Sequence, residues 1–574
     1  MNNKKSVIKI MALILTIFLI SVSITSAIFC KNNSSNINNL DEDKVYTLFA
    51  PQSSLITYLI NYDKEVVHIW DSNYVPGHSA YLLENGNLLR TAFLGPHQIF
   101  LSGGMGGGLQ EIDWNGTVVW DFKYSGSTYL SHHDVKYLPN GNILMIAWEL
   151  KSYEDAILAG RNPNITSMLG IWPDHVIEVK PTGLTSGDIV WEWHIWDHLI
   201  QDYDPSKQNY GVVEDHPELI DINYGKAALD WNHINSIDYN EEFDQIILSV
   251  HNFNEIWVID HSTTTEESAG HTGGNSGKGG DLLYRWGNPK AYRAGTIDDQ
   301  KLFGQHDARW IDAGCPGEGN ILVFNNGLGR PGTPYSSVDE IVPPVDSNGS
   351  YYLEPGSAYG PEEQIWIYTA ENPPDFYSYM ISGAQRIANG NTVICDGKLG
   401  LFFEVNFEKE TVWEYLNPYP NPRLNTVFKI ETYPSNYSGL SNLIQQPKNP
   451  EKPNGTTNGG IGIEYNYSTL TTDPQGDQIY YMFDWGDKSN SGWIGPFNSG
   501  ETANSSHIWK KRGKFNIRVK AKDIYGHESD WSEPLNISIS RGRILINSPN
   551  IQLLEKLMNK FLNIIPILRY LFRL

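Results

Sequence analysis

Short apolar strands that end in tryptophan recur along the first three quarters of the chain. A turn containing Gly or Asp often precedes the strand, and a loop of variable length follows it. A strand pair comes next, and its turn is often Asn-Gly-Asn, as at 85–87 and 140–142. Asn-Gly is a strong hairpin signal because both residues tolerate positive φ. The six copies of the tryptophan strand are Glu65–Trp70, Asn115–Trp120, Gly187–Trp191, Asp281–Trp286, Glu363–Trp366 and Glu410–Trp413.

This repeat predicts an all-β fold made of six small units. Each unit is too small to bury both of its faces, so neighbouring units must cover one another. We therefore expect a six-bladed β-propeller over residues 44–440. A solenoid is the alternative, but the large irregular loops favour a propeller. The sixth unit lacks a clear downstream hairpin, so either 427–430 or 45–48 is expected to close the ring.

The pattern changes after the repeats. Residues 442–459 are rich in Pro, Gly, Asn and Gln, which predicts a linker. Beyond it, segments 473–487 and 515–522 alternate apolar and polar residues between tight turns. This alternation predicts a β-sandwich over 460–541. It resembles the PKD-like, immunoglobulin-like domains of surface proteins, which usually serve as spacers or adhesive modules.

Both ends of the chain are apolar. Three lysines precede an apolar run from Ile10 to Ile28, which predicts a secretory signal over 1–27 or, alternatively, an uncleaved membrane anchor. Lipidation of Cys30 is less favoured because the residues before it form a poor lipobox. Segment 547–574 mixes apolar and basic residues and predicts either a helix packed on the protein or an amphipathic segment on a membrane surface. We expect an exported, extracellular or cell-surface protein.

Composition narrows the function classes. Acidic residues number 66 and basic residues 42, a formal charge of −24, which argues against binding nucleic acid through bulk charge. The 18 Trp, 32 Tyr and 52 Gly favour a folded, β-rich chain. Cys315 and Cys395 supply no disulfide framework, and their spacing leaves a single bond between them open. A homodimer is possible, and the sequence leaves the oligomeric state undecided.

Histidine gives the strongest chemical signal. Each of His78, His133, His233 and His306 begins the strand that leads to the next turn, whereas the fifth copy has Ser382 there. Equivalent positions in a propeller are related by rotation about its axis, so these rings should converge on one central cavity. A single such His is more often structural, bonded to the backbone of a neighbouring blade. Four together favour a shared site.

The strings Asp-Trp-Asn-His-Ile-Asn-Ser at 230–236 and Gln-His-Asp-Ala at 305–308 resemble those of the arylsulfotransferase family. The resemblance covers most of 60–420. It implies an exported six-bladed propeller that moves a sulfuryl group from an aryl sulfate to a phenol without a nucleotide donor, cofactor or metal. The family's nucleophilic His, which becomes a sulfohistidine, matches His306. A second catalytic His matches His233, and a third matches His132 or His133, with His133 preferred because the repeat aligns it.

The resemblance and the repeat also suggest residues that bind substrate. These are Asn235 beside His233, together with His78, His251 and Arg330. His251 stands where the family usually has Arg, and an imidazolium could bind a sulfate oxygen only while it is protonated. Two rival functions follow: a propeller whose axial His residues bind a transition metal, and a non-catalytic ligand-binding surface protein. The imidazole nucleophile suits sulfuryl transfer because it is unprotonated near neutral pH.

Overall fold

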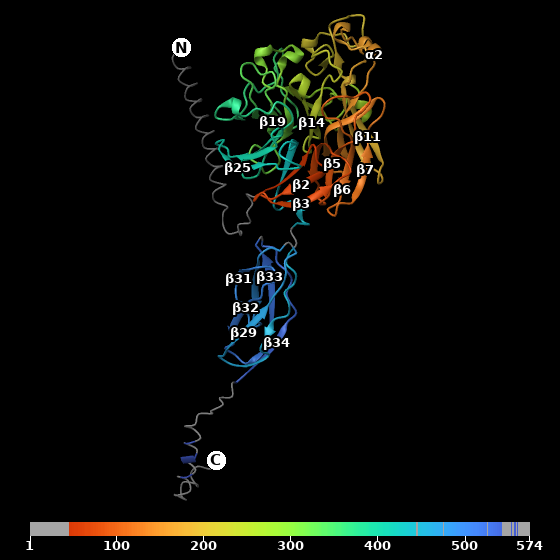
Figure 1. Cartoon of the computed structure of the whole chain (residues 1–574). Helices are drawn as coiled ribbons and strands as arrows, with labels where there is room; N and C mark the ends of the chain where they lie inside the picture. Colours follow the sequence, from red (N-terminus) through yellow and green to blue (C-terminus); the bar gives the residue numbers. More distant parts are fainter. Residues whose placement is uncertain are drawn as a thin grey trace, which may run out of the picture. The chain divides into compact units, whose positions relative to one another are not determined.

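The computed structural model describes residues 45–443, 446–474, 476–524 and 526–541, together with four single positions after 550. The predicted signal or anchor at 1–27 lies outside the described residues, as does most of 547–574. The chain divides into two compact units, Met1–Asn442 and Leu443–Leu574 (Figure 1). None of the helices in the described ranges is long and apolar enough to cross a membrane.

Six antiparallel four-stranded sheets build the first unit. In order from the first strand to the fourth, the sheets are β26-β1-β2-β3, β4-β5-β6-β7, β8-β9-β10-β11, β14-β15-β16-β17, β18-β19-β20-β21 and β22-β23-β24-β25. Their bounds, in chain order, are β1 Val45–Pro51, β2 Ile56–Ile60, β3 Val66–Asp71, β4 Pro76–Leu82, β5 Leu88–Phe93, β6 Gly107–Ile112, β7 Val118–Lys123, β8 Tyr129–Tyr137, β9 Ile143–Glu149, β10 Asp174–Pro181, β11 Gly187–His194, β14 Ile234–Asn240, β15 Gln245–Val250, β16 Glu255–Asp260, β17 Tyr284–Trp286, β18 His306–Trp310, β19 Ile321–Asn325, β20 Ser337–Ile341, β21 Trp366–Tyr368, β22 Gly383–Arg386, β23 Thr392–Asp396, β24 Leu401–Val405, β25 Thr411–Leu416 and β26 Val427–Pro434.

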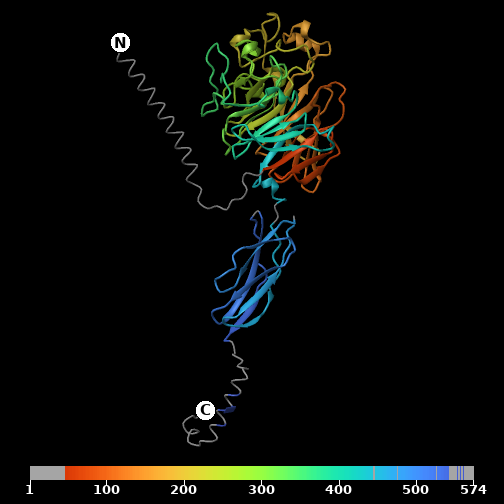
Figure 2. The same cartoon turned by 60° about the vertical axis from the view of Figure 1, so that its left-hand side comes forward.

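The first strands of the six sheets surround one axis. Strands β26, β4, β8, β14, β18 and β22 contact one another in that order, and β22 contacts β26 to complete the circle. Figures 1 and 2 show the sheets of this unit from two directions. The unit is thus a six-bladed propeller, as the repeat predicts. Its ring closes where β26 pairs with β1, with Thr432 opposite Thr47. Both segments that the sequence offers as alternative closures therefore take part.

The tryptophan repeat has a structural cause. All six tryptophans lie on the outermost strand of their sheet. Five of them donate an indole N–H across to the turn before the fourth strand of the next sheet, so the repeat marks blade-to-blade contacts. The pairs are Trp120 to Ser186 O, Trp191 to Thr263 Oγ1, Trp286 to Pro361 O, Trp366 to Phe407 O and Trp413 to Tyr62 O. In the first sheet His68 bonds the next blade instead, at Trp114 O.

Long insertions connect the strands in and between the third to fifth sheets. They carry the short helices α2 (Tyr153–Leu158) and α3 (Thr265–Ser268) and the parallel pair β12 (Leu199–Ile200) and β13 (Ile220–Asp221). Capping boxes at Ser152 and Thr264 begin the two helices. Cys315 and Cys395 are both free thiols, so the bond that the sequence leaves open does not form in this structure.

The second unit is a β-sandwich of a three-stranded and a five-stranded sheet around Trp485, Trp509 and their apolar neighbours. The structure corrects the linker over 442–459, because sandwich strands already begin inside it; Asn and Gly suit these short edge strands as well as they suit a linker. The strands are β27 Asn454–Gly455, β28 Asn458–Gly460, β29 Glu464–Thr469, β30 Ile479–Asp484, β31 Ile494–Phe497, β32 Ala503–Ile508, β33 Gly513–Asp523 and β34 Leu535–Ser540.

Candidate active site

Five imidazole rings meet where the inner strands begin. Successive ring centroids are 5.1 Å apart for His78–His133, 4.6 Å for His133–His233, 5.2 Å for His233–His251 and 5.4 Å for His251–His306. Phe428 of β26 lies against three of them, with centroids 4.8 Å from His78, 5.8 Å from His133 and 6.1 Å from His306. The structure therefore brings together the four repeat histidines and His251, from four different blades.

Backbone strain marks the same position on several blades. His78, His133, His233 and Ser382 have φ of 132°, 52°, 55° and 86°. Positive φ in non-glycine residues costs on the order of 1–3 kcal/mol and is found where the surrounding structure enforces it. Glycine is also required opposite His133, because a Cβ on Gly104 would lie 1.9 Å from the ring. Holding these side chains in place therefore lowers the stability of the folded protein.

A chain of hydrogen bonds fixes which nitrogen of His306 carries its proton. The amide of Asn326 donates to the carbonyls of Ser378 and Ile381, at 2.7 and 2.8 Å. Its oxygen must therefore face His306, whose Nδ1–H donates to it at 2.8 Å. The lone pair is left on Nε2, which accepts a long hydrogen bond from the Ile381 N–H at 3.3 Å. His306 thus presents Nε2 as a nucleophile.

Electrostatics keep that nitrogen unprotonated. Burial, followed by the neighbouring His251, lowers the pKa of His306 well below its usual value. The Asn326 bond opposes this shift but does not outweigh it. An imidazole that stays neutral at physiological pH is a competent nucleophile.

The pKa of His233 is shifted in the opposite direction from that of His306. Its Nδ1 lies 2.5 Å from Oδ2 of Asp230, a carboxylate that also accepts bonds from Ser102 Oγ and Trp148 Nε1. Burial disfavours the imidazolium, but the charge and hydrogen bond of Asp230 outweigh burial and raise the pKa of His233. His233 is therefore the group in the cluster best able to hold a proton and give it away.

His133 is oriented by a buried relay. The Nδ1 of His133 lies 2.8 Å from Nδ1 of His132, whose Nε2 lies 2.8 Å from Oδ1 of Asp174. His132 itself stacks on Trp148 behind the cluster, with centroids 4.0 Å apart. His133 thus faces the axis, and His132 with Asp174 sets the tautomer that His133 presents.

The arylsulfotransferase (ASST) family model matches residues 95–437, which is more than half of the chain and includes most of this cluster. The chain belongs to the arylsulfotransferase family. The resemblance predicted from the sequence is confirmed, and membership supports arylsulfotransferase activity in general, with aryl sulfates and phenols as small-molecule substrates.

Other comparisons add less. No curated protein matches the chain. Among solved structures, the PKD domain of a peptidase from a Thermoplasmatales archaeon is 45% identical and covers 17% of this chain and 98% of its own, with a TM-score of 0.16. The CARDB domain of a Pyrococcus furiosus protein is 10% identical over 17% of this chain and 98% of its own, with a TM-score of 0.13.

In this member of the arylsulfotransferase family, the surroundings of His251 disfavour the imidazolium that the sequence suggests for a sulfate oxygen, and its role in binding substrate stays a prediction. Burial, followed by the charge of His233, lowers its pKa to about 4. The same two causes lower the pKa of His78 to about 3. Both rings are therefore neutral near pH 7, and His233 is the one imidazole of the five whose pKa is raised.

Asn235 and Arg330 make contacts other than those predicted. Asn235 is fully buried, and its amide donates to the carbonyl of Gln305 at 2.8 Å, so it holds the backbone next to His306. Arg330 bonds Tyr335 and Ser337 and stacks on Phe303. None of these contacts joins Arg330 to the imidazoles, and its assignment to substrate stays a prediction.

Sequence reasoning missed the groups that tune the cluster. Asp230 stands three residues before His233, a spacing that could have suggested a partner. Asn326 follows β19 directly, in an Asn-Asn-Gly string, but nothing local links it to His306. Asp174 and Phe428 lie far from the histidine motifs in the chain, and only the propeller brings them near.

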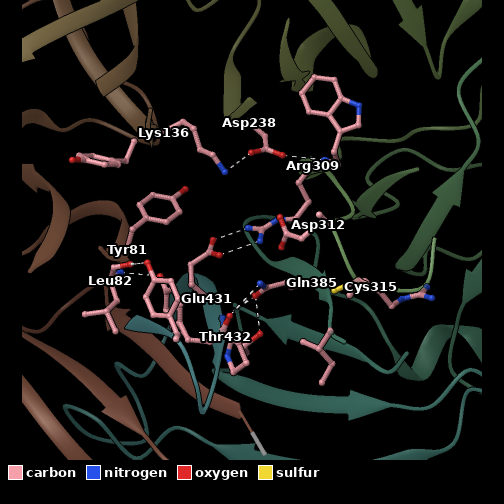
Figure 3. A pocket seen from close by; sticks show the side chains of 18 of the residues that line it. Tyr81, Leu82, Lys136, Asp238, Arg309, Asp312, Cys315, Gln385, Glu431 and Thr432 are labelled. Carbon is pink, nitrogen blue, oxygen red and sulfur yellow. Dashed lines mark hydrogen bonds and ion pairs between the residues drawn. The ribbon is translucent and has the colours of Figure 1, made fainter. Parts of the chain in front are cut away.

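A cavity of about 880 Å³ opens at the other end of the same inner strands. Its lining includes Tyr81, Lys136, Arg309 and Glu431, and Figure 3 shows the ion pairs Lys136–Asp238 and Arg309–Glu431 across it. The sequence predicts a central cavity at the histidines, whereas this cavity lies at the opposite ends of the inner strands. Ion pairs thus occupy one end of the axis and imidazoles the other.

Proposed function

We propose that the protein transfers a sulfuryl group from an aryl sulfate to a phenol through a sulfohistidine at Nε2 of His306. The observation that carries this proposal is the fixed tautomer of His306. Asn326 holds its Nδ1–H, and burial keeps Nε2 unprotonated. Membership in the arylsulfotransferase family supports the reaction class.

In the first half-reaction, the lone pair of His306 Nε2 attacks sulfur, and the bond from sulfur to the aryl oxygen breaks. The protonated His233 gives its proton to the departing phenolate oxygen, so a neutral phenol leaves. The long bond from the Ile381 N–H to Nε2 yields as the nitrogen–sulfur bond forms. In the second half-reaction His233 takes the proton of the incoming phenol, whose oxygen attacks the sulfuryl group and frees His306.

Charge around the cluster suits an anionic group. The carboxylates Asp230 and Asp174 are covered by His233 and His132, to which they are hydrogen-bonded. The sulfuryl oxygens therefore meet imidazoles and not bare carboxylates. The cation on His233 stabilises the negative charge that spreads over these oxygens during transfer.

The experiment is incubation with an aryl sulfate alone, followed by mass spectrometry of the peptide that contains His306. Wild type should gain the mass of one sulfuryl group there, and a phenol should remove it. His306→Gln should show neither adduct nor transfer. His216→Gln is the matched control, because His216 is exposed and bonded only to Glu218. An adduct on another residue, or full activity in His306→Gln, would refute the proposal.

We also propose that the protein is exported, on the strength of the lysines and the apolar run Ile10–Ile28. N-terminal sequencing of protein recovered outside the cytoplasm tests this. A start near residue 28 supports a cleaved signal, and an intact start in the membrane fraction supports an anchor. Recovery of the intact chain in the cytoplasm would contradict export.

A further inference from the structure

A second cluster of histidines lies on the rim of the propeller, away from the axis. Nδ1 of His198 and Nδ1 of His271 approach the same carboxylate oxygen of Asp281, at 2.8 and 2.7 Å. His198 follows β11 in the third sheet, and the other two residues lie in the glycine-rich connection between β16 and β17 of the fourth. Within the described ranges, this is the one group of three His, Cys, Asp or Glu side chains whose ligand atoms all converge.

The surroundings of His198 require a positive charge in this cluster. Its Nε2 lies 2.8 Å from the carbonyl oxygen of Ser268, which can only accept, so Nε2 carries the proton. A neutral His198 then directs the lone pair of Nδ1 at a carboxylate oxygen 2.8 Å away. Two acceptors at that distance repel each other. Either a second proton or a metal ion must lie between them.

We propose that His198, His271 and Asp281 bind one divalent transition-metal ion, with Zn²⁺ the best fit. Two imidazole nitrogens and one carboxylate oxygen are a common zinc ligand set, and a backbone carbonyl that holds the far nitrogen of a ligating His is a common support. Ligand atoms on one tetrahedral ion are about 3.3 Å apart, and those of this cluster lie within 4.8 Å of one another, so a bound ion requires an adjustment of at least roughly 0.5 Å, which the exposed His271 can provide more easily than the buried His198. His271 is 60% exposed, which leaves water access to a fourth position.

The fold holds the buried half of this site tightly. The side chain of His198 is fully buried and stacks on Trp193, whose indole N–H bonds the carbonyl of Gly280. A Cβ on Gly280 would lie 1.9 Å from Ser268 O and 2.6 Å from Nε2 of His198. Only glycine fits there. An ion bound here would join the connection β16–β17 to the third sheet, and so tie together the blades that carry His133 and His233.

The test uses the full chain, stripped of metal by a chelator and then titrated with Zn²⁺ or Co²⁺. Wild type should bind a single ion saturably, and Co²⁺ should show the visible absorption of a tetrahedral site. Zn²⁺ should raise the melting temperature with the logarithm of its free concentration. His271→Ala, at an exposed position, should fold normally and lose at least the about ten- to hundredfold in affinity that is typical when an outer-shell partner of a metal ligand is removed. His216→Ala should bind as wild type does.

Three results would overturn the proposal. Wild type without saturable binding would mean that a second proton on His198 supplies the charge. Unchanged affinity in His271→Ala would place the ion elsewhere. Loss of binding in His306→Gln, with His271→Ala unaffected, would assign the ion to the axial imidazoles, and adduct formation on His306 would remain a separate question.

Discussion

The two ends of the propeller axis are built from the same six strands and differ sharply in charge. Where the strands begin, neutral imidazoles surround one that favours its proton. One residue further on, the side chains are ionic: Asp134 follows His133, Asp307 follows His306 and Lys429 follows Phe428. Lys429 Nζ lies 2.9 Å from Asp134 and 3.1 Å from Asp307. Successive side chains on a strand point to opposite faces of its sheet, so the ionic side chains lie in a different layer from the imidazoles.

The difference shows two uses of burial. At the strand ends, carboxylates and cations form ion pairs, and Arg309 donates hydrogen bonds to both carboxylate oxygens of Glu431. Paired in this way, the charges stabilise the ring of inner strands and are not free to react. At the strand starts, burial without a counter-charge lowers the pKa of His306, and one carboxylate raises that of His233. A base can react only where no counter-charge neutralises it. The neighbouring layer of ion pairs instead stabilises the folded propeller.

The largest expected effect comes from removing the carboxylate partner of His233. Asp230→Asn should lower the transfer rate about 10²- to 10⁴-fold, because His233 loses the charge that keeps it protonated. The free energy of unfolding should change far less than in the ion-pair variant below. Steady-state rates with an aryl sulfate and a phenol measure the first, and urea unfolding the second. Wild-type rates in Asp230→Asn would remove His233 from the mechanism.

Lys429→Met tests the other end. Two buried carboxylates would lose their shared cation, which should cost about 3–5 kcal/mol of unfolding free energy. The rate per folded molecule should stay close to wild type, because Lys429 touches none of the imidazoles among the contacts described. Urea unfolding, with activity measured well below the transition, checks both. A large loss of rate with little loss of stability would show that the ion pairs take part in catalysis together with the imidazoles.

The pH profile should reflect the split between the two histidines. His306 must be unprotonated, and its pKa is lowered, so the acid limb should lie well below the usual histidine value. His233 must be protonated, and its pKa is raised, so activity should fall only above that value. The rate plateau should therefore span pH 6.5, the ordinary pKa of histidine. A rate that climbs steadily from pH 6 to 9 would contradict the assignment of His233 as the acid.

The smallest change is expected for His251→Arg. A permanent cation beside His233 and His306 should stabilise sulfuryl oxygens, raising the rate by up to about tenfold, which corresponds to about 1.4 kcal/mol. It should also lower the pKa of His233, so the alkaline limb should move to lower pH. The full pH–rate profile measures both effects. An unchanged alkaline limb would show that position 251 does not interact electrostatically with His233.

The sequence predicts the propeller and the meeting of the histidines because both rest on repeats. Five of the six repeat tryptophans bond the next blade, and each repeat histidine lies in or directly before an inner strand, so the repeat predicts the geometry. Residues outside the repeat are different. Asp174 reaches His132 from β10, and Asn326 reaches His306 from the end of β19, across distances in the chain that no local pattern encodes.

Burial and loop direction explain the other differences. The pKa of His251 depends on how deeply the folded chain encloses it, which its sequence neighbours do not reveal. Arg330 follows a strand that leads to the site, but its loop turns it onto Phe303 and Tyr335. Residues 454–460 read as a linker because short edge strands need no alternating apolar positions.

The pairing of β26 with β1 has a consequence for biosynthesis. The strand that brings Phe428 to the imidazoles and Lys429 to the carboxylates is the last one of the ring to leave the ribosome. Lys429 and Asp134 are 295 positions apart in the chain. Until that strand arrives, the histidines lack the wall that encloses them, and Asp134 and Asp307 lack their shared cation. A chain released early therefore cannot assemble the histidine cluster, and only the finished ring could carry the sulfuryl group that we propose for His306.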